Sequence, residues 1–413
     1  MGRAPKEPIE VGDEVTVTLG AMVHGGHCLA HPRGHTAFVR HGLPGEGVVI
    51  RITEVRSKLV RADVVEVLEA SPHRVVPPCS WAHAGGCGGC DFQHVSIAHQ
   101  RELKGTIAHE SLARHGDIDA GALTAQPLAH DDGLHWRTRM RFSVDGGGTA
   151  GMLGARSHGV LPVDRCLLAS ASIDALAIPD DEWRGAQSIE ATEDSHGRAS
   201  IWVDRVLVSG PRKARQQVHH RSWEIDGTAF WQVHPRAAEA IVDHVLAAGA
   251  PQPGERWLDL YSGAGLITAF LGEAVGVTGA ITAVESHRTA VRDGRRALAD
   301  LPQVSFVGAD VEAWALPDGV DGVVLDPPRR GAGAAVMTAI AQAGPRVIVY
   351  VACDPVAFAR DAATLGAHGY ALDALAVLDA FPMTHHMECI ARFVPGSQAA
   401  AGQVQRLEAN RLP

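Results

Sequence analysis

The spacing of apolar and polar residues predicts a small β-barrel in the first part of the chain, residues 1–70. Short segments in which apolar and polar residues alternate occur at residues 14–19, 36–40, 47–53 and 62–68. Glycine and proline separate these segments, and no helical period intervenes between them. Strict alternation is typical of half-buried strands. The pattern therefore predicts a barrel of roughly five strands.

The pattern in residues 71–227 is mixed and predicts a β-rich central part. Residues 98–115 have helical character, and an alternating stretch begins at Arg137. A period of two places Arg137, Arg139 and Arg141 on one face of a strand. Such a face either follows a phosphate backbone or is simply solvated. We interpret this part as a platform for a nucleic-acid substrate.

From residue 228 to residue 395, helical and strand patterns alternate. Apolar strand segments end near Tyr261, Glu285, Asp310, Asp326 and Cys353, with helical segments between them. This repetition predicts an α/β fold with a doubly wound sheet, in which ligands bind beyond the carboxyl ends of the strands. The tail at 396–413 is small and polar, and we expect it to be disordered.

Composition limits the classes of function. The chain has 413 residues, a formal net charge of −10 and 46% hydrophobic residues, so it can bury sizeable cores in two or three domains. A protein that only binds nucleic acid would usually be basic, so any RNA surface must be local. No apolar run approaches 18 residues, and the start lacks an apolar signal segment. We therefore expect a cytoplasmic protein without a membrane span.

The cysteines are an odd, clustered set, which favours metal binding or catalysis over disulfides. Three of them lie in a glycine-rich segment and a fourth follows downstream, at Cys79, Cys87, Cys90 and Cys166. Four thiolates suit a structural zinc ion or a [4Fe–4S] cluster, and the spacing does not decide between them. Unpaired, reduced cysteines in a loop are the remaining alternative.

The strand ends carry candidate chemistry. Gly263 and Gly265 open a helix after the first strand, and Glu285 ends the second strand, where an acid can bind ribose hydroxyls. This is neither the dinucleotide glycine motif nor a phosphate loop with its lysine, so we expect another nucleoside-type cofactor. Cys353 and Asp354 follow a buried strand. Cys353 is either a nucleophile at the mouth of a site or a half-buried structural cysteine.

Five motifs in order carry a family resemblance. They are Phe230-Trp-Gln-Val-His234, Asp259-Leu-Tyr-Ser-Gly-Ala-Gly265, Asp326-Pro-Pro-Arg-Arg-Gly331, Tyr350-Val-Ala-Cys-Asp-Pro355 and Phe381-Pro-Met-Thr-His-His-Met-Glu388. Together they strongly resemble the RNA uracil-5-methyltransferases of the TrmA/RumA type, which have a class I methyltransferase domain. The barrel and the cysteines resemble the 23S ribosomal RNA branch, whose members carry a TRAM domain and a [4Fe–4S] cluster.

The resemblance implies roles for individual residues. It implies that Cys353 is the nucleophile and Glu388 the base, and that the four clustered cysteines hold the iron–sulfur cluster. It implies that the residues contacting S-adenosyl-L-methionine are Gln232, Tyr261, Glu285, Asp310 and Asp326. The implied partner is an RNA substrate, with 23S ribosomal RNA favoured over transfer RNA, and no stable protein partner is expected. A non-catalytic RNA-binding ribosome assembly factor with the same fold is the alternative from another class.

The residue types also suit the reaction itself. Uracil C5 is a poor nucleophile, and addition of a thiolate to C6 makes it reactive. Asp354 stands where the family more often has asparagine, and its charge would raise the pKa of Cys353 unless it points away. If residues 382–388 form a strand, Glu388 shares one face with Thr384 and His386, and Cys389 faces the core.

Overall fold

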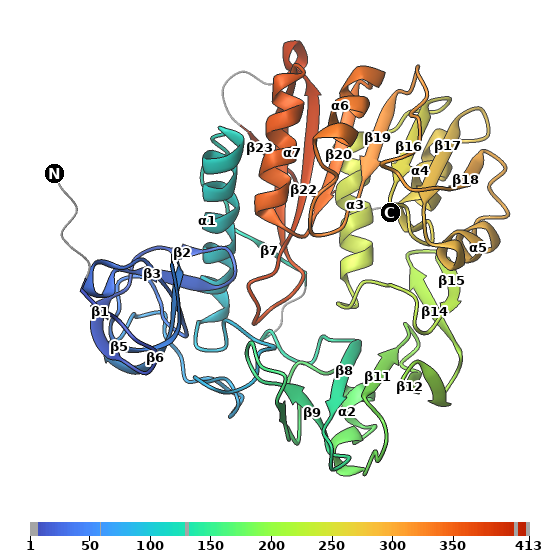
Figure 1. Cartoon of the computed structure of the whole chain (residues 1–413). Helices are drawn as coiled ribbons and strands as arrows, with labels where there is room; N and C mark the ends of the chain where they lie inside the picture. The colour runs from blue at the N-terminus through green and yellow to red at the C-terminus, as the bar shows by residue number, and fades with distance from the viewer. Residues whose placement is uncertain (1–6, 58, 129–131, 400–403, 410–413) are drawn as a thin grey trace.

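The computed structural model describes residues 7–57, 59–128, 132–399 and 404–409, which form a barrel, a central β-rich part and a large α/β part (Figure 1). Residues 1–6, part of the start on which the prediction of no signal segment rests, lie outside this description. No helix among the described residues is long and apolar enough to cross a membrane.

The barrel consists of six strands, where the sequence predicted roughly five. They are β1 (Glu14–Thr18), β2 (Met22–Val23), β3 (His27–Ala30), β4 (Ala37–Arg40), β5 (Gly47–Arg56) and β6 (Leu59–Glu69), in the order β1-β5-β6-β4-β3-β2. The alternation places Val48, Ile50 and Ile52 of β5 in the barrel core. The buried Glu46 carboxylate, in the turn before β5, accepts a hydrogen bond of 2.6 Å from Nε of Arg74, which lies beyond β6.

The central part combines helix α1 (Ile97–Gly116) with a second antiparallel sheet. The sheet has the order β10-β9-β8-β11-β12-β13, and a separate hairpin follows it. The sheet strands are β8 (Arg139–Val144), β9 (Ala150–Leu153), β10 (Val160–Leu161), β11 (Ser188–Glu193), β12 (Ala199–Val203) and β13 (Val206–Ser209). The hairpin strands are β14 (Lys213–Val218) and β15 (Arg221–Asp226). Short helices lie at α2 (Ala171–Asp174) and η2 (Ile178–Asp180).

The predicted arginine face on β8 is wrong for two of its three members. Arg139 is largely buried, and its guanidinium donates hydrogen bonds to the carbonyl oxygens of Gly227 and Ala229. Arg137 precedes the strand and lines a pocket beside the cysteines. Arg141 is exposed, as predicted. The period of two holds for Arg139 and Arg141, which both lie in β8, but it does not distinguish a solvated arginine from one that binds buried carbonyl groups.

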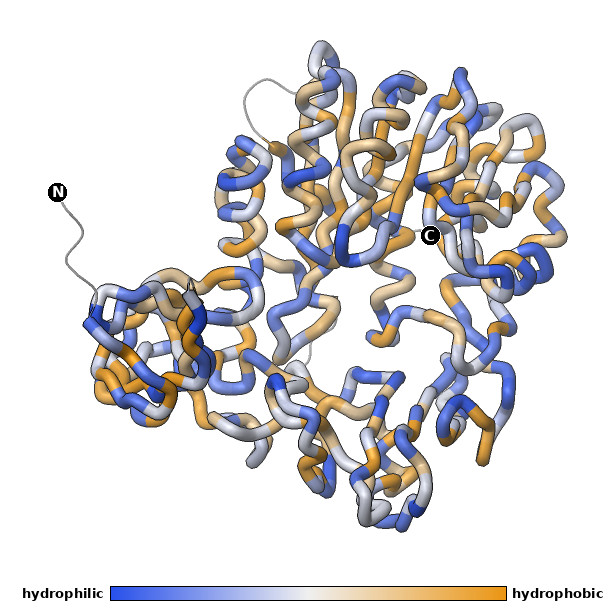
Figure 2. Tube along the Cα trace, viewed as in Figure 1, coloured by the Kyte–Doolittle hydropathy of each residue, from blue (hydrophilic) through white to orange (hydrophobic). Residues whose placement is uncertain are grey.

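The α/β part confirms the predicted doubly wound sheet. Its strands are β16 (Arg256–Leu260), β17 (Ala280–Glu285), β18 (Val304–Gly308), β19 (Gly322–Leu325), β20 (Val347–Ala352), β21 (Tyr370–Asp379) and β22 (Glu388–Pro395). They follow the order β18-β17-β16-β19-β20-β22-β21, with β22 antiparallel to both of its neighbours. β7 (Gln126–Pro127) from the central part pairs with β21. Figure 2 shows hydrophobic residues along the strands and helices of this part, and also in the barrel and the central part.

Helices cover both faces of this sheet (Figure 1). α1, α6 (Ala334–Ala343) and α7 (Pro355–Ala367) pack together on one face. α3 (Ala237–Gly249), α4 (Leu266–Val275) and α5 (Arg288–Ala297) lie on the other. Because β20 lies in the middle of the sheet, all six of its residues are buried.

The prediction that the tail is disordered is wrong for part of it. Gly396–Gln398 forms a short 3-10 helix, and β23 (Gln405–Arg406) adds a parallel strand next to β21. Leu407 is buried, and its N–H donates to the carbonyl oxygen of Leu375. Residues 400–403 and 410–413 lie outside the described part. The hydrophobic Leu407 between polar neighbours gives this strand its anchor.

Candidate active site

The predicted nucleophile lies where the sequence analysis placed it, at the end of β20. Asp354 next to it caps helix α7, because its carboxylate accepts hydrogen bonds from Val356 N at 3.0 Å and Ala357 N at 2.8 Å. Its other oxygen lies 3.1 Å from Nε2 of His24 in the barrel. Burial alone would raise the pKa of Asp354, but His24 and the backbone donors lower it to about 2. The carboxylate is thus engaged with α7 and the barrel, and its charge still contributes, after burial and the charges of Glu388 and Asp326, to the raised pKa of the Cys353 thiol.

The predicted base is next to the nucleophile in the sheet. β22 runs antiparallel to β20, and Ala352 faces Cys389 in the register. Cys353 directly follows β20 and Glu388 directly precedes Cys389 in β22, so the two residues lie at the same end of this strand pair, and the charge of Glu388 acts on Cys353. Cys389 is fully buried in the core, as predicted.

In the absence of ligands, the surroundings of both groups raise their pKa values and so favour the neutral forms. Burial, followed by the charges of Glu388 and Asp326, raises the pKa of the Cys353 thiol to about 12. Burial, followed by the charge of Asp326, raises the pKa of Glu388 well above its usual value. Arg329 opposes both shifts. Glu388 Oε2 is buried without a hydrogen-bond partner among the described residues, so it is available to a substrate.

The segment before Glu388 is a turn, so the predicted strand face shared with Thr384 and His386 is wrong. β22 begins at Glu388 itself. Thr384 Oγ1 donates to Phe381 O at 2.8 Å and accepts from His386 N at 3.2 Å. The Thr384 hydroxyl therefore forms, within the turn, hydrogen bonds with backbone groups that a neighbouring strand would otherwise form. The alternation of residue types does not reveal these local bonds, so it suggested a strand.

The predicted cofactor residues gather at the carboxyl ends of four neighbouring parallel strands. Tyr261 follows β16, Glu285 ends β17, Asp310 lies just beyond β18, and Asp326 follows β19. Gln232 lies in the connection between β15 and α3. Within the described part of the chain, no hydrogen bond joins Gln232 to the strand-end residues.

The loop after β16 forms a cradle. Glu285 accepts a 3.0 Å hydrogen bond from Gly263 N, and a Cβ added at Gly263 would meet no atom within 4 Å. Tyr261 has a left-handed backbone with φ of 63°. In residues 259–262, three buried polar atoms have no hydrogen-bond partner among the described residues: Asp259 Oδ1, Tyr261 OH and Ser262 Oγ. Open space, a strained turn and unpaired polar atoms are the features expected of a binding loop.

The electrostatics of this edge favour a cation. Burial, with the neighbouring charges of Asp326 and Glu285, raises the pKa of Asp259 to about 7. Burial also raises the pKa of Asp326. A cation bound between these carboxyl groups would stabilise their ionised forms. Asp259 and Arg329 belong to motifs identified from the sequence, but only the structure shows their electrostatic roles.

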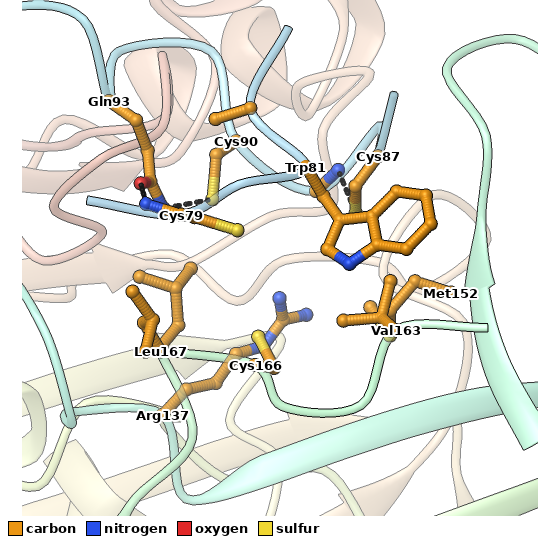
Figure 3. Close-up of a pocket in the computed structure, with 13 residues that line it drawn as sticks. Cys79, Trp81, Cys87, Cys90, Gln93, Arg137, Met152, Val163, Cys166 and Leu167 are labelled. Carbon is orange, nitrogen blue, oxygen red and sulfur yellow. Dashed lines mark hydrogen bonds between the residues drawn. The ribbon is translucent and has the colours of Figure 1, made fainter. Parts of the chain in front are cut away.

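The four predicted cysteines line one pocket (Figure 3). Cys87 Sγ accepts from Gly89 N and Cys90 Sγ accepts from Gln93 Nε2, both at 3.3 Å. Burial raises the pKa of Cys87, Cys90 and Cys166. Within the described ranges, no group of three or more cysteine, histidine or acidic side chains is arranged to hold a single metal ion. The structure therefore brings the cysteines together without identifying what they bind.

Comparisons with known proteins identify the two ends of the chain. The TRAM domain family matches residues 8–65, and the tRNA (uracil-5-)-methyltransferase family matches residues 310–393. The computed structure resembles that of a Pyrococcus abyssi tRNA (uracil-54, C5)-methyltransferase in complex with S-adenosyl-L-homocysteine. The TM-score is 0.71 at 19% identity, over 92% of this chain and 100% of that one, which supports the fold.

Sequence relatives match over nearly their full length. An RNA methyltransferase of Streptomyces coelicolor is 38% identical, over 96% of this chain and 97% of the relative. A 23S rRNA (uracil(1939)-C(5))-methyltransferase of Alkalilimnicola ehrlichii is 34% identical, over 95% of this chain and 97% of the relative. With the strand-end chemistry described above, these matches confirm the expected family: the chain belongs to the RNA uracil-5-methyltransferases.

Proposed function

We propose that this protein methylates C5 of a uridine in 23S ribosomal RNA through a covalent bond between Cys353 and C6 of the base. The observation that carries the proposal is the adjacent placement of Cys353 and Glu388 at the ends of β20 and β22, beside the acidic strand ends. A nucleophile and a base on neighbouring strands of a rigid sheet suit a reaction that needs both on one base.

Cys353 acts in the addition step of the reaction, and Glu388 acts in the elimination step. The Cys353 thiolate forms the S–C6 bond and breaks the C5–C6 double bond, which makes C5 a carbon nucleophile. S-adenosyl-L-methionine supplies the methyl group that C5 takes up. Glu388 then removes the C5 proton, the C5–C6 double bond forms again, and the S–C6 bond breaks. Arg329 is the nearby cation that favours the ionised thiol.

The strand-end cradle would hold the cofactor. Tyr261, Glu285, Asp310 and Asp326 lie at adjacent strand ends, and Glu285 is placed for ribose hydroxyls. The acidic edge suits a sulfonium cation. For Gln232 the proposal rests on the motif alone.

The cysteine pocket is proposed to hold a [4Fe–4S] cluster with a structural role. Four cysteines converge on it, and N–H groups donate to two of the sulfur atoms, as is usual around such clusters.

The choice of 23S ribosomal RNA rests on the relative at 34% identity and on the barrel with its cysteines. The family description matched by residues 310–393 names transfer RNA, so transfer RNA is the alternative substrate. Methyl transfer to each RNA, unmodified and purified separately, distinguishes them. A non-catalytic assembly factor would bind RNA without transferring methyl groups to either.

Substitutions separate the nucleophile from the base. Cys353→Ala should abolish methyl transfer and the adduct trapped with 5-fluorouridine RNA, because fluorine cannot leave as a proton does. Glu388→Gln should still add the thiol but stall, so a denaturation-resistant protein–RNA species accumulates. Cys389→Ala is the matched control, because Cys389 neighbours Glu388 but faces the core. A trapped adduct with Cys353→Ala would refute the assignment.

A further inference from the structure

The loop between β21 and β22, residues 380–387, is held in place by the cysteine-bearing loop of the central part. The N–H groups of Asp91 and Phe92 both donate to Met383 O at 3.0 Å. Asp91 Oδ2 accepts a hydrogen bond from His385 N at 3.2 Å and lies 2.6 Å from His385 Nδ1. Asp91 directly follows Cys90, so one loop contributes both to the cysteine pocket and to the support of the segment that ends at Glu388.

The turn between β2 and β3 of the barrel packs against Asp91 and His385. The turn between β2 and β3 contains Gly26, where an added Cβ would lie 2.9 Å from Asp91 Cβ and 3.2 Å from His385 Cβ. His24 in this turn bonds to Asp354, and its ring packs edge-on against His385 at a centroid distance of 5.6 Å. Three parts of the chain therefore meet around the Asp91–His385 pair.

From His385 the contacts continue to the active site. The ring centroids of His385 and His386 lie 4.0 Å apart, and His386 Nε2 lies 3.4 Å from Arg329 Nη2. Arg329 is the cation that acts on both Cys353 and Glu388. A displacement of His385 would thus reach Arg329 through His386 and reach Glu388 through the backbone.

The first part of the loop has separate support from α1. Lys104 Nζ donates to Asp379 Oδ1 at 2.6 Å and to Phe381 O at 3.0 Å. Gln100 Oε1 accepts from Met383 N at 2.9 Å. Loss of the Asp91 carboxylate would therefore leave the start of the loop in place and release residues 385–387, which lead directly into Glu388 at the start of β22.

We propose that Asp91 is a positioning residue for the methyltransferase reaction, which holds His385 and, through it, keeps Arg329 and Glu388 in register with Cys353. The expected effect on the reaction rests on the proposed function. The expected effect on the position of the loop rests on the contacts alone. Because Glu388 acts in the elimination step, a displaced loop should slow release of the product more than attack by Cys353.

The test compares Asp91→Ala and Asp91→Asn with wild type and with Asp194→Asn. Asp194 is the control, because its buried carboxylate also accepts backbone hydrogen bonds, from His196, Arg198 and Arg215, but none of these partners belongs to the loop at 380–387. Two measurements are made on each full-length protein: amide hydrogen exchange of residues 381–388, and the partition of RNA between covalent adduct and methylated product.

For Asp91→Ala we expect exchange in residues 381–388 to be at least about tenfold faster. We expect kcat to fall about tenfold to a hundredfold with KM within about twofold, and adduct to accumulate on ordinary RNA. The exchange rate and kcat of Asp91→Asn should lie between those of wild type and Asp91→Ala, because the amide oxygen of the new side chain still accepts a hydrogen bond from His385 N. The control should change neither measurement.

Two outcomes would overturn the proposal. One is exchange in Asp91→Ala that matches the Asp194→Asn control. The other is faster exchange with an unchanged partition between adduct and product. If wild type forms neither adduct nor methylated RNA, the proposed function fails, and the exchange measurement still decides whether Asp91 holds the loop.

Discussion

The ligand-free protein should carry Cys353 as a protonated thiol, and its reaction with iodoacetamide tests this directly. An ordinary cysteine has a pKa of about 9, whereas burial and the carboxylates of Glu388 and Asp326 raise the pKa of Cys353 to about 12. Three units correspond to a thiolate population lower by about a thousandfold, or about 4 kcal/mol. Because the pKa lies above the range from pH 6 to 10, the thiolate fraction should rise about tenfold per pH unit throughout that range.

The assay measures carboxamidomethylation of Cys353 by peptide mass spectrometry from pH 6 to 10 in the absence of RNA and cofactor. We expect the logarithm of the rate to rise with a slope of about one per pH unit and without a plateau, since only the thiolate reacts. Limited access would lower the rate at every pH but would not change the slope. A plateau near pH 7 would show a preformed thiolate and refute the electrostatic reasoning.

The remaining predictions concern the cysteine pocket and two buried cations. Protein purified without oxygen should be brown with about four irons per chain, and a colourless protein with one zinc would exclude the cluster. Arg139→Ala should lower the free energy of unfolding in urea by about 1–3 kcal/mol, because two buried carbonyl groups lose their donor. The exposed control Arg141→Ala should change it by less than about 0.5 kcal/mol and should weaken the salt dependence of RNA binding. Lys104→Met leaves the buried Asp379 carboxylate without its closest cation, so we expect a loss of about 3 kcal/mol; an unchanged urea midpoint would contradict this.

Hydrophobic periodicity was sufficient to predict the sheet and the residues at the ends of its strands. The six consecutive buried residues of β20 follow directly from an apolar run that only a central strand can bury on both sides. The positions of Tyr261, Glu285 and Asp326 follow from the same rule, because parallel strands bring their carboxyl ends to one edge. These predictions depended on local pattern and on chain direction.

The hydrophobic pattern could not predict contacts between segments that are distant in sequence. The bond between His24 and Asp354 joins residues of different domains, and neither has a neighbour in sequence that reveals the other. Arg139 alternates as a surface residue does, although Gly227 and Ala229 cover it. The turn at Thr384 resembles a strand because its hydroxyl supplies bonds that period counting does not detect.

Nucleoside analysis of RNA treated with the purified protein tests the central claim most directly. Unmodified 23S ribosomal RNA is incubated with S-adenosyl-L-methionine and either wild type or Cys353→Ala, digested to nucleosides and separated by mass spectrometry. We predict 5-methyluridine with wild type and none with Cys353→Ala. A methyl group on another nucleoside, or 5-methyluridine formed equally by Cys353→Ala, would contradict the account.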